Sequence, residues 1–229
     1  MDHSLQPHAT RGLVFSQFLL GLGARLFIAL PFLRRAHGLD RLSPDRRHLF
    51  VCNHVSLLDS IMLGALCWMS RCYPMLVLGD RKVWHASWLR RFLSRRTAFL
   101  IERGKLNQNL IGELELFGRA GAEFQLVVFP EGTRGDGVNV APCQPGIYHV
   151  AQAARLAIVP VFLENMQLIS TKTGRFHLFR GLRKVEVHYG EPIEPEQYLD
   201  MTREDFLEFI RRSIAAAKPT DANSHSPHR

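Results

Sequence analysis

Apolar positions divide the chain into one long apolar segment, residues 12–33, followed by short apolar runs that alternate with amphipathic stretches. The runs that have the length of buried strands are 48–53, 74–78, 98–102, 125–130 and 157–163, with two later runs at 175–179 and 184–190. The stretches with helical periodicity are 57–70, 82–93, 106–120, 147–155 and 202–217, the last opening with Thr202 as N-cap and Asp205 at N3. This alternation predicts an α/β fold with a mixed, largely parallel sheet flanked by helices, to which the late strands add an antiparallel portion.

The long apolar segment predicts a helix that lies in a membrane interface. Its length matches the roughly 20 residues that cross a bilayer. However, Arg25 near its middle would cost about 2.5–3.5 kcal/mol there, and Pro31 interrupts its last turn. Gln17, Gly21 and Arg25 are spaced by four residues and form a narrow polar or small stripe on an otherwise apolar helix. An interfacial helix is therefore expected, a buried core helix is the alternative, and a spanning helix is disfavoured.

Length and composition are those of one globular domain with a short appendage. The chain has 229 residues, 46% of them hydrophobic and fifteen of them Phe, which is enough for a sizeable core. We expect a membrane-associating segment over 1–43, the globular domain over 44–217 and a disordered polar tail over 218–229.

The charge balance favours an anionic partner. Lys and Arg total 29 against 21 acidic residues, a net charge of +8, which suits nucleic acid, a phospholipid surface or a phosphorylated substrate. Arg11, Arg34 and Arg35 flank the apolar segment, and each would contribute about 1 kcal/mol near anionic head groups. The four cysteines lack CxxC spacing and no cleavable signal peptide is recognised, so a reducing, cytoplasmic-side setting is expected.

A His and an Asp follow the first predicted strand of the domain. Asn53 and His54 end that strand at the edge where open α/β sheets place ligands. On one continuous helix His54 and Asp59 would point about 140° apart, so we expect His54 to precede the helix, with Ser56 as its N-cap. Asp59 could then fold back, accept a hydrogen bond from one ring nitrogen and leave the other as a general base. The alternative is a strand end with Asp59 interacting with the helix dipole.

Two further polar sequences follow predicted strands. A turn-rich sequence, FPEGTRGDG (129–137), carries Glu131 and Arg134, and Arg103 leaves the strand at 98–102. A surface turn with an ordinary ion pair is the alternative, but three polar sequences at three strand exits favour one shared site. Cys52 ends an apolar strand and is expected to be a small buried residue, not a nucleophile. No metal is implied, because His54 and Asp59 have no third ligand at recognisable spacing.

Four short sequence blocks resemble the motifs of a known protein family. NHVSLLD (53–59), FLIER (99–103), FPEGTR (129–134) and IVPV (158–161) resemble, in order, the four motifs of the lysophosphatidic acid acyltransferase family. The resemblance implies that His54 is the general base and Asp59 orients it. It also implies that Arg103 and Arg134, at neighbouring strand exits, bind the anionic acceptor. It adds Glu131, Gly132 and Thr133 as substrate-binding or structural partners. Two departures, Glu102 where the family has Asp and CQPG (143–146) where it has a basic segment, bear on the acceptor more than on the reaction.

The implied function is acyl transfer on a membrane. An acyl-CoA or acyl carrier protein thioester would donate a fatty acyl group to a lysolipid hydroxyl, with neither cofactor nor metal. The simplest acceptor is 1-acylglycerol 3-phosphate, giving phosphatidic acid at the cytoplasmic face of the inner membrane, and a lyso-ornithine lipid is the alternative. Backbone amides of the Gly-rich turn are candidate oxyanion donors.

Two rival functions fit the sequence less well. A hydrolase would want a GxSxG-type serine, and the sequence has none. A basic membrane- or nucleic-acid-binding module without chemistry would leave NHVSLLD and FPEGTR unexplained, so nucleic acid is not an expected partner.

Overall fold

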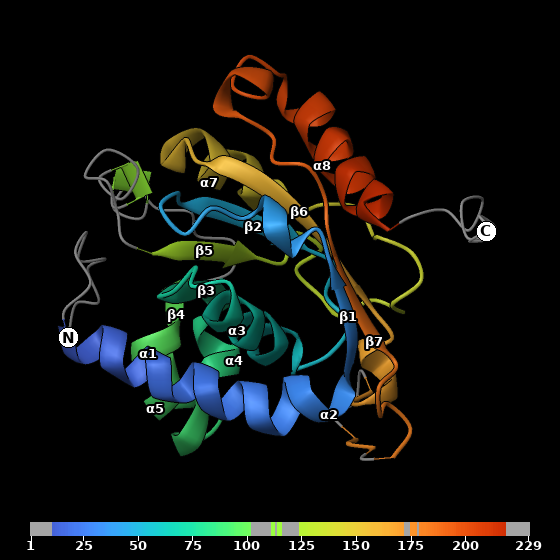
Figure 1. Ribbon diagram of the computed structural model, residues 1–229. Helices are drawn as coiled ribbons and strands as arrows, with labels where there is room; N and C mark the ends of the chain where they lie inside the picture. The colour runs from blue at the N-terminus through green and yellow to red at the C-terminus, as the bar shows by residue number, and fades with distance from the viewer. Residues whose placement is uncertain are drawn as a thin grey trace.

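A single mixed sheet organises the described part of the chain (Figure 1). The computed structural model describes residues 11–101, 111–112, 114–115, 124–171, 175–177 and 179–218. Its strands are β1 (Leu33–His37), β2 (His48–Cys52), β3 (Met75–Asp80), β4 (Ala98–Ile101), β5 (Gln125–Val128), β6 (Ala157–Glu164) and β7 (Val185–Tyr189). The strand order is β1-β7-β6-β2-β5-β3-β4, and every neighbouring pair is parallel except β6 and β7. The predicted mixed, largely parallel sheet with a late antiparallel portion is therefore confirmed.

Helices cover both faces of this sheet. The longer ones are α1 (Arg11–Ala24), α3 (Asp59–Met69), α5 (Trp88–Thr97), α7 (Gly146–Ala154) and α8 (Arg203–Ala217). The short ones are η1 (Arg25–Ala29), α2 (Leu30–Phe32), η2 (Leu39–Arg41), α4 (Arg81–Trp84), η3 (Met166–Leu168) and η4 (Pro195–Gln197). Leu49 and Val51 of β2 join the core beneath α7 and α8, whereas Phe50 and Cys52 join the core beneath α3 and the N-terminal helix. Because β2 is buried on both faces, its sequence is a continuous apolar run without alternation.

The N-terminal helical segment, α1 through α2, packs on the domain with its polar stripe inward. Gln17 is buried, and its amide donates to the carbonyls of Met75 and Arg96 and accepts from the Met75 amide. A Cβ on Gly21 would lie 2.7 Å from Trp68, and the Arg25 guanidinium lies 5.3 Å from the Trp68 ring centre. The stripe predicted from the sequence is therefore the packing face.

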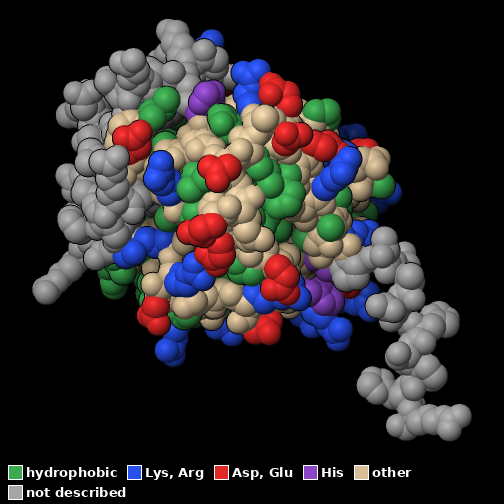
Figure 2. All heavy atoms as spheres, turned by 90° about the horizontal axis from the view of Figure 1, so that it is seen from above, with side chains coloured by type: hydrophobic (Ala, Val, Ile, Leu, Met, Phe, Trp, Pro, Cys, Tyr) green, Lys and Arg blue, Asp and Glu red, His purple; other side chains and the backbone are tan. Residues whose placement is uncertain are grey.

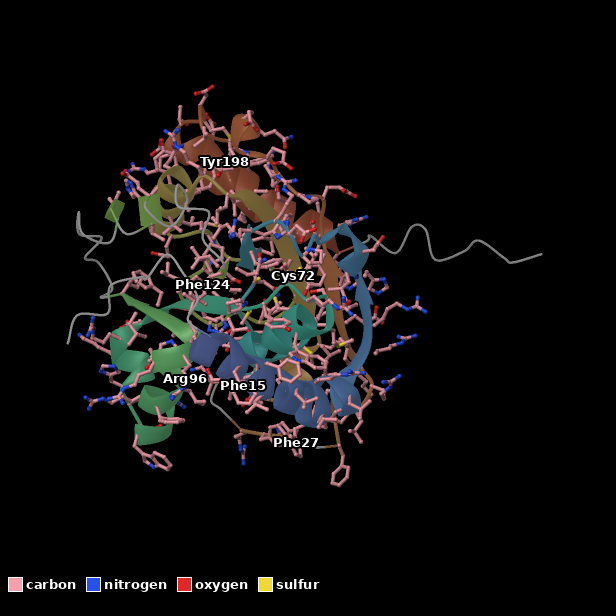
Figure 3. The ribbon with its side chains drawn as sticks, turned by 60° about the vertical axis from the view of Figure 1, so that its left-hand side comes forward. Phe15, Phe27, Cys72, Arg96, Phe124 and Tyr198 are labelled. Atoms are coloured by element: carbon pink, nitrogen blue, oxygen red, sulfur yellow. The ribbon has the colours of Figure 1, made fainter. Side chains whose placement is uncertain are left out.

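The apolar side of the same segment faces outward. The exposed side chains include Phe15, Leu19, Leu26, Phe27 and Leu30. Figure 3 shows Phe15 and Phe27 in the lower part of the molecule, at the other end from Tyr198. Residues Leu13–Phe32 are long and apolar enough to cross a membrane, by length and composition. Since this apolar side is open, the alternative of a buried core helix does not hold.

Several elements differ from the sequence prediction. Strand β1 was not predicted, because it is a short edge strand whose Arg34 and Arg35 are exposed. The predicted helix 82–93 is two helices, and Ser87 caps the second by accepting a hydrogen bond from the Arg90 amide at 3.3 Å. The predicted strand 175–179 is wrong in the described part, where only an isolated bridge joins Ser170 to Phe176.

Two sequence predictions fall largely outside the described residues. Of the predicted helix 106–120, residues 111–112 and 114–115 are described and are helical. Of the predicted tail 218–229, the described part contains Lys218.

Candidate active site

The site begins where the central strands β2, β5 and β6 end. Asn53, directly after β2, is buried, and its side-chain amide donates to the Leu163 carbonyl and accepts from the Leu163 amide, at 3.1 and 2.6 Å. Through these two bonds the Asn53 side chain extends the β2–β6 pairing beyond the last backbone pair. They fix the point at which the chain leaves the sheet. The next residue, His54, thereby starts from a rigid position. The sequence analysis gave Asn53 no role of its own.

Asp59 holds His54 in place. Its side chain is fully buried, and Oδ2 accepts hydrogen bonds from His54 Nδ1 and from the amides of Val55 and Ser56, at 2.8, 2.6 and 2.8 Å. The predicted fold-back of Asp59 onto the His54 ring is therefore present. Since Nδ1 donates its hydrogen to a carboxylate, Nε2 carries the lone pair. Among the described residues no hydrogen bond reaches Nε2.

The start of α3 differs from the expectation in one respect. Ser56 is not its N-cap, because α3 begins at Asp59 and its N-cap residue, Leu58, makes no side-chain cap. Ser56 Oγ instead accepts from the Leu58 amide at 3.1 Å, within the turn between β2 and α3. Asp59 takes over the capping chemistry, since it binds two amides ahead of the helix from its first turn.

Glu131 joins the exit of β2 to the loop after β5. It is buried, and its two carboxylate oxygens accept from the amides of His54 and Ala141 at 2.8 and 3.1 Å. Burial raises the pKa of Glu131, and these two hydrogen bonds oppose the rise. The Gly135 amide donates to the His54 carbonyl at 2.7 Å, and the Phe129 ring stacks on the His54 ring with centres 4.4 Å apart. Both contacts bring the loop against the histidine.

The rest of the FPEGTR turn faces outward around the histidine. Gly132 adopts a left-handed conformation with φ of 66°, which favours glycine, and Thr133 is exposed. Arg134 is half-buried, and its Nη1 is a buried donor without a hydrogen-bond partner among the described residues. A buried guanidinium donor without an acceptor is costly in a resting protein. An anion bound there would satisfy it.

Arg103, the remaining predicted site residue, lies with Glu102 outside the described residues. Strand β4 ends at Ile101, and β3 lies between β4 and β5. Arg103 and Arg134 therefore do not leave neighbouring strands, contrary to the sequence expectation. At the usual strand spacing the axes of β4 and β5 are about 10 Å apart.

The described cysteines are poor nucleophiles. All four are buried and unpaired. Burial raises the pKa of Cys52 well above its usual value and raises the pKa of Cys143 to about 12. Cys52 therefore lies beside the site as a small buried side chain, in keeping with the sequence expectation.

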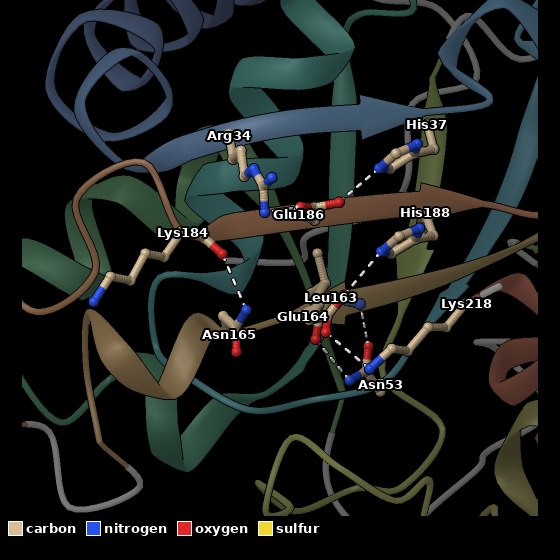
Figure 4. A network of polar contacts seen from close by, with 10 residues as sticks. All are labelled: Arg34, His37, Asn53, Leu163, Glu164, Asn165, Lys184, Glu186, His188 and Lys218. Carbon is tan, nitrogen blue, oxygen red and sulfur yellow. Dashed lines mark hydrogen bonds and ion pairs between the residues drawn. The ribbon is translucent and has the colours of Figure 1, made fainter. Parts of the chain in front are cut away.

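A second cluster of titratable side chains lies two strands away from β2 (Figure 4). His37, Glu186 and His188 bring ligand atoms within 4.8 Å of one another and could hold a metal ion. In the structure His37 Nε2 bonds Glu186 at 2.7 Å, and His188 Nε2 bonds Glu164 at 3.1 Å. Arg34 and Lys218 pair with the same two carboxylates. A dication would have to displace these cations, so the cluster is built as a polar network that ties β1, β7 and β6 together.

Comparison with known proteins identifies relatives of this arrangement. A family model described as Acyltransferase matches residues 34–164. The 1-acyl-sn-glycerol-3-phosphate acyltransferase of Saccharomyces cerevisiae is 30% identical over 172 residues, which cover 72% of this chain and 52% of that protein. The lyso-ornithine lipid O-acyltransferase of Pseudomonas aeruginosa is 32% identical over 196 residues, which cover 77% of this chain and 69% of that protein.

A solved structure shares the fold. The 1-acyl-sn-glycerophosphate acyltransferase PlsC of Thermotoga maritima matches with a TM-score of 0.64 and 19% identity, over 89% of this chain and 78% of that one. The chain spans about half the length of the yeast and Cocos nucifera 1-acyl-sn-glycerol-3-phosphate acyltransferases that it matches. Since the family model covers more than half of the chain, this protein belongs to the acyltransferase family, among the relatives of the lysophosphatidic acid acyltransferases.

Proposed function

We propose that the protein is an O-acyltransferase that moves a fatty acyl group from a thioester to the hydroxyl of a lysolipid, with His54 as general base. The observation that carries the proposal is the bond from His54 Nδ1 to the fully buried Asp59, which leaves Nε2 free on a partly exposed ring. A base needs an available lone pair and a fixed orientation, and this arrangement supplies both.

The reaction needs no covalent enzyme intermediate. His54 Nε2 takes the proton of the acceptor hydroxyl as its oxygen attacks the thioester carbonyl carbon. The tetrahedral intermediate then collapses, the carbon–sulfur bond breaks, and the departing thiolate takes the proton back from the imidazolium. Ester and free thiol are the products, so no cofactor is consumed. Asp59 stabilises the imidazolium between the two proton transfers.

Donors for the oxyanion come from the FPEGTR turn. The amides of Gly132 and Gly135 already donate to Phe129 and His54 carbonyls. Among the described residues the amides of Thr133 and Arg134 have no acceptor. We assign these two amides, on the loop that contacts His54, to the oxyanion that develops on the thioester carbonyl.

The proposed acceptor carries an anionic head group bound by Arg134. Its unpartnered Nη1 supports this role, and a guanidinium matches phosphate oxygens in paired charge-assisted bonds. The first candidate is 1-acylglycerol 3-phosphate, on which the yeast relative acts by its name. Arg103, outside the described residues, is proposed as the second anion-binding side chain.

A lyso-ornithine lipid is the second candidate acceptor. The observation that favours it is the match to the Pseudomonas aeruginosa protein, which extends over a larger share of both chains than the yeast match does. Ornithine has one carboxylate and an amine in place of a phosphate, so the two acceptors differ in charge. The departures at Glu102 and at CQPG (143–146) bear on this choice.

The proposed setting is the cytoplasmic face of the inner membrane. The exposed apolar side of the N-terminal helix would rest in the lipid, where lysolipid acceptors reside. Acyl-CoA or acyl carrier protein would deliver the donor from the aqueous side.

Product analysis tests the proposal. The full-length protein is incubated with acyl-CoA or acyl carrier protein thioester and with 1-acylglycerol 3-phosphate, phosphate-free 1-acylglycerol or lyso-ornithine lipid, and the lipids are identified by mass. Phosphatidic acid as the main product supports the first acceptor, and acylated ornithine lipid supports the second. No transfer to any acceptor, from protein shown to be folded, would overturn the proposal.

A matched pair of variants tests the anion site. Arg134→Ala should raise the KM of the phosphate acceptor far more than that of the donor, whereas Arg134→Lys should recover part of the loss because it restores charge without paired geometry. Equal losses for charged and phosphate-free acceptors would assign Arg134 to structure instead.

A further inference from the structure

Three segments far apart in the sequence carry basic and apolar residues without a single acidic one. Residues 11–39, 81–101 and 165–185 contain fifteen of the 29 Lys and Arg residues and none of the 21 Asp and Glu residues. We propose that helix α5 and the described residues of the segment 175–184 join the N-terminal helix in one membrane-contact surface for anionic lipid. The proposal rests on the lipid function proposed above and extends its membrane contact beyond the N-terminal helix.

Helix α5 has the composition of an interfacial helix. Trp88 is 81% exposed, and Phe92, one turn later, is also exposed. Arg91 and Arg95 form a second exposed stripe beside them, and the Arg96 guanidinium lies 4.8 Å from the centre of the Phe92 ring. Aromatic rings at the head-group level with basic side chains beside them are typical of helices that lie in an anionic interface. On a soluble domain, a contiguous exposed apolar patch marks a site of interaction with a partner or a membrane.

The segment before β7 repeats this composition without a helix. Phe179 is 80% exposed, and Phe176 and Leu182 are exposed beside it. The basic residues of this segment that are described and exposed are Arg175, Arg180, Arg183 and Lys184. The sequence predicts a strand at 175–179, but an exposed segment of apolar and basic side chains is better suited to contact with lipid than to pairing in a sheet.

Both segments are fixed to the N-terminal helix, at opposite ends. Gln17 in α1 donates to the Arg96 carbonyl at the end of α5. The Arg183 amide donates to the Pro31 carbonyl at 3.0 Å, and the Phe32 and Phe176 rings meet edge to face. In Figure 1, α5 lies below α1 on the left and the segment before β7 lies below α2 on the right. Figure 3 shows Arg96 on the same lower side as Phe15 and Phe27.

The charge distribution gives this surface an orientation. Residues 186–208 hold eight of the 21 acidic residues and one basic residue, Arg203, and run from β7 into the first half of α8. Figure 2 views the molecule from that side, where Asp and Glu side chains are interspersed with Lys and Arg side chains. An anionic bilayer would attract the surface around α1 and α5 more strongly than the side of α8, where acidic side chains pair with arginines. This uneven distribution of basic side chains favours lipid as the occupant over a second copy of the chain, whose matching surface would be equally basic.

Vesicle binding of the full-length protein tests the proposal. Flotation is measured with vesicles of phosphatidylcholine alone and of phosphatidylcholine mixed with phosphatidylglycerol. We expect tight binding to the mixed vesicles, weakened about tenfold or more by Trp88→Ser with Phe92→Ser and by Phe179→Ser. Arg91→Gln with Arg95→Gln should weaken binding to the mixed vesicles about tenfold and leave binding to neutral vesicles unchanged. The matched control is Arg203→Gln with Arg212→Gln on α8, which should change neither.

The readouts separate this proposal from the function on which it rests. Each variant is also tested for cooperative thermal unfolding and for acyl transfer to acceptor dispersed in detergent micelles, both of which should match the wild type. Loss of vesicle binding in a chain that performs no acyl transfer would still support the surface. The proposal is overturned if the α5 and Phe179 variants bind mixed vesicles like the wild type, or if the α5 arginine variant loses binding to nucleic acid but not to vesicles.

Discussion

The end of β2 and the N-terminal helix reverse the usual placement of side chains in opposite ways. At the end of β2, polar side chains that usually contact water are buried, among them Asn53, Asp59 and Glu131. On the N-terminal helix, apolar side chains that usually avoid water are exposed, and Phe27 is 76% accessible. Each arrangement costs free energy in an isolated soluble domain. Each is therefore informative about what the region binds.

The two regions compensate for that cost differently. The buried carboxylates of Asp59 and Glu131 accept five hydrogen bonds from the loop around His54, so their cost is met inside the protein and the loop becomes rigid. The exposed apolar side of the helix has no such internal compensation in the described residues, and the proposed membrane contact would offset its cost. The rigid loop around His54 therefore serves the proposed chemistry, and the exposed side of the N-terminal helix serves the proposed membrane contact.

The sharpest test of the polar region is His54→Ala. Loss of a general base typically costs about 10²–10⁴-fold in rate, and we expect kcat to fall by that amount. Because the His54 ring is partly exposed and its backbone bonds to Glu131 and Gly135 remain, thermal unfolding should change little. Near-normal turnover in a folded variant would remove His54 from the mechanism.

Substitution of Asp59 should separate the effect of its negative charge on turnover from the effect of its hydrogen bonds. In Asp59→Asn the amide oxygen can occupy the position of Oδ2 and still accept three hydrogen bonds, but the negative charge is gone. We expect kcat to fall about 10- to 100-fold, since the imidazolium loses its stabilising partner. The amide nitrogen would lie at the position of Oδ1, for which the described residues offer no acceptor.

Asp59→Ala provides the contrast. It leaves two buried amides and the His54 Nδ1 hydrogen without an acceptor, so the free energy of unfolding should fall by several kcal/mol.

The kcat of Asp59→Asn decides between the two roles of Asp59. If it equals the kcat of the wild type, Asp59 acts by orienting His54 and not through its charge.

Two substitutions, one on each side of the N-terminal helical segment, test which side packs on the domain and which side faces outward. Gln17→Ala removes a buried amide and leaves Met75 and Arg96 backbone groups unpaired, so we expect a loss of about 1–3 kcal/mol in the free energy of unfolding. Phe27→Ser, on the exposed side, should change that free energy by less than about 0.5 kcal/mol but weaken vesicle binding. Denaturant titration measures both. A stability loss from Phe27→Ser larger than that from Gln17→Ala would reverse the assigned faces.

The sequence predicted the local part of the site because that part depends on short spacing. His54 and Asp59 are five residues apart, and helix geometry alone required His54 to precede the helix for the two to meet. The partners that the sequence did not predict are distant in the chain. Asn53 bonds Leu163, 110 residues away, and Glu131 bonds the amide of His54, 77 residues away. Such pairings depend on strand order, which periodicity does not specify.

Strand order also explains the errors in the fold. The central strands were predicted because burial on both faces makes them continuous apolar runs. The edge strand β1 pairs on one side with β7 and exposes two arginines, so its sequence lacks that signal. The segment 175–179 has the apolar and aromatic content of a strand, but in the described residues it faces outward instead of pairing.

The smallest expected effect is a pH dependence of stability that comes from two buried imidazoles, His48 at the start of β2 and His188 in β7. Burial lowers the pKa of both side chains, although a hydrogen bond with Gln125 opposes the shift for His48 and a hydrogen bond with Glu164 opposes it for His188. A lowered pKa in the folded state means that unfolding takes up protons in acid. The stability these two residues contribute is therefore present above the unfolded pKa near 6.5 and is lost as pH falls through the lower folded pKa.

Thermal unfolding between pH 7.5 and 5 checks this dependence, with a change of about 1 kcal/mol lowering Tm by about 2–4 °C in a chain of this size. His188→Gln removes one of the two buried imidazoles and should flatten the profile below pH 6.5, at some cost in stability at neutral pH. His149→Gln is the matched control, because His149 is exposed and should leave the profile unchanged. If His188→Gln lost stability in acid as steeply as the wild type, the dependence would have to come from His48 or from the carboxylates. The charging of the buried His188 imidazole would then not be the source of acid sensitivity at the β6–β7 edge.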